Sequence, residues 1–170
     1  MDLGILILRL VVGLTLAAHG SQKLFGWFGG YGLSGTGAFM EQQLGFRPGR
    51  LHAALSGLAE AGGGLLLAAG LFTPLAAAAI VSVMFVAIVS VHLAKGFFTQ
   101  NGGLEFPLVV ASSSVAVAFT GPGAVSFDRV LGIAWQGEAW GIAALVAGLL
   151  MGAAPLLARK LEHAPTPKPA

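Results

Sequence analysis

Five apolar runs alternate with glycine-rich or polar segments along the chain. A helix rises about 1.5 Å per residue, so roughly 20 apolar residues cross a hydrocarbon layer of about 30 Å. Few stretches alternate polar and apolar residues with the period of two that a membrane β-barrel strand requires. The pattern therefore predicts an all-α, polytopic membrane helix bundle, with helices over residues 3–18, 51–71, 75–94, 104–120 and 140–157.

The composition favours a membrane protein and removes several kinds of chemistry. Only 9% of the 170 residues are charged, against about 25% in soluble domains. The sequence has no cysteine, which excludes thiol catalysis, disulfides, iron–sulfur ligation and covalent haem attachment through this chain. It also has no nucleotide-binding loop, catalytic triad or hydrolase carboxylate pair, so we find no stand-alone catalytic motif and no sign of a nucleic-acid partner.

The segment between the first two apolar runs, residues 19–50, is rich in glycine and aromatic residues. His19-Gly20 is typical of a helix end, and the glycines over residues 26–37 disfavour a regular helix there. We therefore expect only a short surface helix, over residues 38–44. The aromatic side chains are typical of a belt at the membrane interface: Trp27, Phe28 and Tyr31.

Basic residues gather on one side of the predicted bundle. With five spans, the loop after the first helix, the loop after the third helix and the C-terminus share a side. The opposite side holds Arg129, and also Arg9 if its side chain extends toward that surface. The positive-inside rule then predicts a multi-pass protein of the cell's inner (plasma) membrane, with the N-terminus outside and the C-terminus cytoplasmic. The basic residues on the predicted cytoplasmic side are Lys23, Arg47, Arg50, Lys95, Arg159, Lys160 and Lys168.

Two charged residues, Arg9 and Glu60, fall inside apolar runs, where a charge at the membrane centre costs about 3 kcal/mol. They lie on neighbouring antiparallel helices, and the helical rise places them within reach, so we expect a buried ion pair between them. In one interpretation the pair is structural and fixes the helix register. In a second, Glu60 carries a proton or binds a ligand, which makes it the candidate catalytic residue. In a third, Arg9 simply reaches the interface.

A second polar group is predicted near the cytoplasmic face, where the ends of four helices meet. Imidazole, ammonium and carboxylate groups at one depth could hold a small polar head group, and we consider a quinone first. Haem or metal ligation is a weaker alternative because the spacing follows no local ligand motif, so we expect no metal site. Ordinary interfacial hydrogen bonding is a further alternative. Together with Glu60, the candidate ligand-binding residues are His19, Lys23, His52, His92 and Glu105.

The fifth apolar run carries small residues along one face, with Gly148 and Gly152 one turn apart. Small residues at this spacing let another helix approach closely in a membrane. We expect this face to form an interface with a protein partner or with a second copy of the chain.

Four stretches of the chain carry a family resemblance when they are taken together and in order. They are LRLVVGLTLAAHGSQKLFGWFGG at 8–30, GLAEAGGGLLLAAGL at 57–71, VAIVSVHLAKGFF at 86–98 and GPGAVSFDRVL at 121–131. This set resembles the DoxX family of small bacterial and archaeal membrane proteins. The resemblance implies a four-helix membrane core over residues 1–131, to which this chain adds a fifth helix over 132–160 and a disordered tail over 161–170.

The same resemblance implies site residues and leaves three functions open. The family's motif positions fall here on Arg9, His19, Lys23, Glu60, His92 and Asp128, and Asp128 is expected to be structural, capping or pinning the segment after the fourth helix.

By resemblance, the chain is a subunit of, or an accessory to, a quinone-linked or oxidative-stress redox system. It then binds a quinone or another small molecule and docks redox protein partners. The alternatives are a small proton-coupled transporter or a lipid- or solute-binding protein, and a structural membrane scaffold. Membrane lipid is a partner in every case, and whether the chain is an enzyme stays open.

Overall fold

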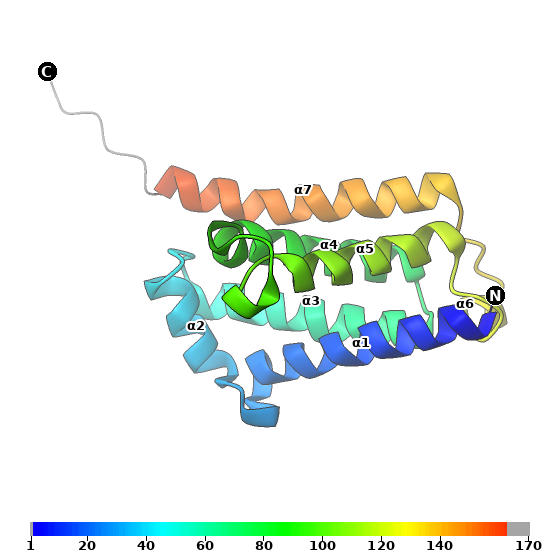
Figure 1. The fold of residues 1–170 in the computed structure, drawn as a ribbon, viewed down its shortest axis with the longest axis horizontal. Coiled ribbons are helices and arrows are strands. Elements are labelled where there is room, and N and C mark those ends of the chain that lie inside the picture. The colour runs from blue at the N-terminus through cyan, green and yellow to red at the C-terminus, as the bar shows by residue number, and fades with distance from the viewer. Residues whose placement is uncertain (1, 163–170) are drawn as a thin grey trace, which may run out of the picture.

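The computed structural model describes residues 2–162 and is all-helical over that range (Figure 1). Its long helices run side by side along the long axis, as the five apolar runs predict. Two shorter α-helices, α2 (Gly32–Gln42) and α6 (Phe127–Val130), lie at opposite ends of the bundle. The long helices are α1 (Asp2–Phe25), α3 (Gly49–Ala69), α4 (Thr73–Ala87), α5 (Glu105–Thr120) and α7 (Glu138–Glu162).

Within residues 2–162, four stretches are long and apolar enough to cross a membrane, so the chain is a membrane protein. The helix that starts with α4 continues through a π-helical turn (Ile88–His92) and a 3₁₀ turn (Leu93–Lys95) before it ends. The expected fourth span, α5, is apolar but shorter, with 16 residues, whereas the expected fifth span, in α7, is among the four. It packs beside α4 and α7. The four stretches are Asp2–Phe25, Gly49–Ala69, Thr73–Lys95 and Glu138–Leu161.

Helix α4 lies at the centre of the bundle, where it packs against α3, α5 and α7. Its sequence is apolar on every side, which is typical of a helix that other helices surround. Ile80 is fully buried there and belongs to one core cluster with Leu16 of α1, Leu67 of α3 and Val117 of α5. The core therefore joins four of the long helices.

The segment between α1 and α3 differs from the prediction in two ways. Helix α1 does not end at His19-Gly20 but continues to Phe25, because Gly20 is a packing residue, buried where α1 meets α3. The glycine-rich stretch also forms a regular helix, since α2 begins at Gly32 rather than at residue 38. In α2, a Cβ on Gly37 would lie only 2.9 Å from the backbone of Arg50. Glycine is needed there because α2 packs tightly against the start of α3.

The glycine face of α7 packs inside the chain, which corrects the expected partner interface. A Cβ built on Gly148 would lie 2.6 Å from Cβ of Val81 and 2.8 Å from the carbonyl of Ala78, both on α4. A Cβ on Gly152 would lie 2.8 Å from the carbonyl of Ser82. The small residues thus serve the contact between α7 and α4, and they are not free to receive another molecule.

The bundle has two chemically different ends, to which we give names. The hairpin end holds the tight turn between α3 and α4 together with α6, and the basic end holds the last turn of α1, α2, and the last turn of α7 (Figure 1). Leu161 and Glu162 belong to α7, whereas residues 163–170 of the expected disordered tail lie outside the described residues. The basic end carries Lys23, Arg47, Arg50, Lys95, Arg159 and Lys160.

Candidate functional site

A buried ion pair links α1 to α3 on the side of the basic end. The Nζ atom of Lys23 lies 2.6 Å from Oε1 of Glu60 and also donates a hydrogen bond of 2.9 Å to Oγ of Ser56. Ser56 and Glu60 are four residues apart, so they stand one above the other on the same face of α3. The side chain of Glu60 is only 4% exposed, whereas that of Lys23 is 25% exposed. The pair is therefore buried at the carboxylate and open at the ammonium group.

One oxygen of this carboxylate has no partner. Oε2 of Glu60 is buried and makes no hydrogen bond with the residues that the structure describes. A buried acceptor without a partner typically costs about 1 to 3 kcal/mol, and more when it is charged. Oε2 is thus available to accept a hydrogen bond from a proton-bearing group.

The sequence places Lys23 and Glu60 together through close packing of α1 and α3. Gly57 and Gly20 lie at this crossing, where a Cβ on Gly20 would come 2.6 Å from the carbonyl of Gly57. Because these residues are small, the two backbones approach closely enough for the lysine to reach down from the end of α1. The flexible stem of a lysine allows its charged end to extend along the helix in this way.

The expected ion pair between Arg9 and Glu60 is wrong, because the helix register separates the two residues. Gly13 of α1 packs against Gly64 of α3. Arg9 lies four residues to one side of that contact and Glu60 four residues to the other. Eight residues along a helix correspond to roughly 12 Å, which is beyond the reach of an ion pair.

Arg9 instead caps the C-terminus of α3, where the last carbonyl groups of a helix lack partners. Its side chain is 1% exposed. Nε donates to the carbonyl of Leu67 at 3.0 Å and Nη2 to that of Ala68 at 2.8 Å. Nη1 donates to the carbonyls of Pro122 and Val125, the latter at 3.0 Å. A cation at this end of a helix is also favourable for the helix dipole. Arg9 therefore ties the loop after α5 to α3.

Asp128 performs the complementary task at the start of α4. Its side chain, 1% exposed, accepts hydrogen bonds from the backbone N–H of Phe72 at 2.7 Å and of Thr73 at 3.0 Å, and from Oγ1 of Thr73 at 2.7 Å. Its own N–H donates to the carbonyl of Gly70 at 2.8 Å. A carboxylate at a helix N-terminus satisfies free N–H groups and suits the dipole. The residue pins the α3–α4 turn, rather than only the segment after the fourth helix.

The predicted group of histidines is not assembled into one site. His19 is exposed and packs against Phe106, with ring centroids 5.6 Å apart, and His52 packs against Phe46 at 5.1 Å. Nδ1 of His92 lies 2.7 Å from the carbonyl of Gly102. Over residues 2–162, no three His, Asp or Glu side chains are grouped so that they could hold a metal ion.

Glu105, the carboxylate of that predicted group near the basic end, also has a partner close to it in the sequence. Oε2 of Glu105 accepts a hydrogen bond of 2.9 Å from the backbone N–H of Thr99 in the preceding turn. Of the candidate ligand-binding residues, the structure joins Lys23 and Glu60 by an ion pair. Ser56 also belongs to this group, although the sequence analysis does not name it as a site residue. Its position one helical turn before Glu60 is the feature of the sequence that indicates it.

A comparison with protein families gives one match, and the other comparisons give none. The DoxX family model matches residues 4–93, a region that contains α1 to α4 and both the Lys23–Glu60 pair and Arg9. No curated protein and no solved structure matches the chain. The match ends before α5, α6 and α7.

Proposed function

Because the chain belongs to the DoxX family of helical membrane proteins, we propose that it is a membrane subunit of, or an accessory to, a quinone-linked redox system. In this proposal the Lys23–Glu60 pair binds the head group of a quinol. The observation that carries it is the buried, unpartnered Oε2 of Glu60 beside a cationic ammonium group.

The chemistry of the pair suits a hydroxyl-bearing ring. A quinol hydroxyl donates a hydrogen bond to Oε2 of Glu60, which has no donor among residues 2–162. Nζ of Lys23 donates to the oxygen of the same hydroxyl. Lys23 is 25% exposed, so the ammonium group is reachable from the side of the basic end. His19, one turn before Lys23 on α1, is exposed and flanks this approach.

The proposal gives this chain a binding role and assigns electron transfer to a protein partner. The sequence has no cysteine for an iron–sulfur cluster, and His19, His52 and His92 each contact a different residue.

We propose that the chain is located in the inner membrane, with the basic end facing the cytoplasm. Most of the lysine and arginine residues lie at that end, as the positive-inside rule requires.

The experiment is a titration of the full chain in lipid nanodiscs with decylubiquinol, for the wild type and for Glu60→Gln. A hydrogen bond to a charged group contributes about 1.5 to 3 kcal/mol, so Glu60→Gln should raise Kd at least about tenfold. Glu105→Gln is the matched control, because this carboxylate lies at the same end and is bound to Thr99. It should leave Kd unchanged.

Four outcomes would count against the proposal. Wild-type chain that does not bind decylubiquinol refutes it outright, and so does equal affinity of the wild type and Glu60→Gln. A Glu60→Gln variant that changes only the melting temperature points to a scaffold. Proton-dependent uptake of a solute into proteoliposomes, lost in the same variant, points to a transporter instead.

A further inference from the structure

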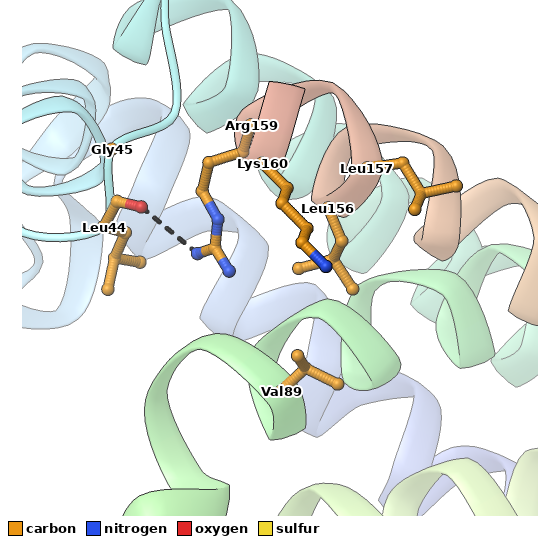
Figure 2. A pocket seen from close by; sticks show the side chains of 7 residues that line it. All are labelled: Leu44, Gly45, Val89, Leu156, Leu157, Arg159 and Lys160. Atoms are coloured by element: carbon orange, nitrogen blue, oxygen red, sulfur yellow. Dashed lines mark hydrogen bonds between the residues drawn. The ribbon is translucent and has the colours of Figure 1, made fainter. Parts of the chain in front are cut away.

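An open groove of about 470 Å³ lies at the basic end, and its lining residues come from outside the helices α1 and α3 that carry the Lys23–Glu60 pair (Figure 2). It opens where the last turns of α7 pass the turn between α2 and α3 and the π-helical turn after α4. Its wall is mostly apolar, and two basic side chains, Arg159 and Lys160, lie on it. The lining residues are Leu44, Gly45, Val89, Leu156, Leu157, Arg159 and Lys160.

Arg159 is held in place on one wall. Nη1 donates to the carbonyl of Leu44 at 3.1 Å, drawn in Figure 2, and to Oγ of Ser90 at 3.2 Å. The guanidinium group also lies over the ring of Phe46, 4.7 Å from the ring centre, which is a cation–π contact. These contacts fix a positive charge at the edge of the groove.

Lys160 adds a second positive charge on the groove. Its side chain is exposed and makes no ion pair or hydrogen bond within the described part of the chain. Figure 2 shows it extending beside Leu156 above Val89. No carboxylate is among the residues that line the groove. The groove thus combines the two positive charges of Arg159 and Lys160 with an apolar wall.

We propose that this groove binds one anionic phospholipid. The lipid phosphate lies between Lys160 and Arg159, and one acyl chain lies on Leu44, Val89 and Leu156. Basic pockets between membrane helices near the cytoplasmic face are suited to anionic head groups. The apolar wall distinguishes a phospholipid from a free phosphate ion, which has nothing to bury there.

The test uses the full chain in neutral detergent micelles that contain phosphatidylglycerol and phosphatidylcholine in equal amounts, with identical acyl chains. Native mass spectrometry reads which lipid the protein retains. The wild type should prefer phosphatidylglycerol, and Lys160→Gln should lower this preference about fivefold, the effect of one basic residue at a membrane surface. The matched control is Lys95→Gln, a lysine of the same end outside the groove, which should keep the preference.

A second pair of variants tests the apolar wall. Val89→Trp fills the groove and should lower retention of both lipids, whereas Val109→Trp, on the exposed surface of α5, should not. Equal retention of the two lipids by the wild type overturns the proposal, as does an equal loss in the two lysine variants. Displacement of phosphatidylglycerol by inorganic phosphate, with Val89→Trp without effect, also overturns it, because the site would then be an anion site alone.

Discussion

Replacing Asp128 with alanine should strongly destabilise the hairpin end of the bundle. The substitution removes three hydrogen bonds, to the N–H groups of Phe72 and Thr73 and to the hydroxyl of Thr73. Each hydrogen bond to a charged group contributes about 1.5 to 3 kcal/mol, but neighbouring bonds do not add fully. The substitution also leaves the two N–H groups without their acceptor, which costs about 1 to 3 kcal/mol for a buried group. We therefore expect Asp128→Ala to lower the free energy of unfolding by about 4 kcal/mol.

The assay is thermal unfolding of the full chain in detergent, followed by the helical circular dichroism signal. For a chain of this size, 1 kcal/mol corresponds to about 2 to 4 °C, so Asp128→Ala should lower Tm by roughly 8 to 16 °C. Asp128→Asn keeps one side-chain oxygen as an acceptor. Its Tm should therefore lie between those of the wild type and Asp128→Ala, with about half of this loss. If Asp128→Ala does not fold, the asparagine variant carries the test.

Asp2→Ala is the matched control, because Asp2 also accepts a hydrogen bond at the hairpin end. It receives one bond, from the N–H of Ala124 at 2.9 Å, and its side chain is exposed. Its loss should cost less than about 1 kcal/mol. If Asp128→Ala and Asp2→Ala lower Tm equally, Asp128 does not pin the α3–α4 turn and our reading of this end is wrong.

Two further predictions follow from the helix packing and the charge distribution. A Cβ at Gly64 would lie 2.5 Å from a carbonyl of α1, whereas a Cβ at Gly62 would meet nothing within 4 Å. Gly64→Ala should therefore lower stability by about 1 to 3 kcal/mol while Gly62→Ala does not lower it, and equal melting temperatures would contradict the packing. In this cysteine-free chain, a membrane-impermeant maleimide added to intact cells should label Leu131→Cys but label Gln100→Cys only after permeabilisation. The reverse pattern would refute the proposed orientation.

The sequence predicts the long helices because each one leaves a continuous apolar run of helical length. It cannot predict α2, because the glycines at residues 32, 35 and 37 have low helix propensity. The structure uses the absence of a side chain at Gly37 to bring α2 against the start of α3. Tertiary packing thus overrides local propensity in this segment, and the same reason explains why α1 continues past Gly20.

The charged residues were found by sequence, but their partners were not. Arg9 and Glu60 stand out because they are charged residues in apolar runs. Their pairing depends on how α1 and α3 slide along one another, and a shift of a few residues changes the partner. Arg9 and Asp128 bind backbone groups at helix ends. Because every residue has such groups, the sequence does not indicate which of them a side chain binds. Lys23 at the end of α1 is the true partner of Glu60.

The measurement that tests the central claim most directly is infrared difference spectroscopy of the full chain in lipid, recorded on addition of decylubiquinol. The claim is that Oε2 of Glu60 is a binding position. It predicts a carboxylate difference band that is lost in Glu60→Gln and kept in Glu105→Gln. A wild-type spectrum without such a band, or a band that survives in Glu60→Gln, would contradict the claim and leave the Lys23–Glu60 pair as a structural contact between α1 and α3.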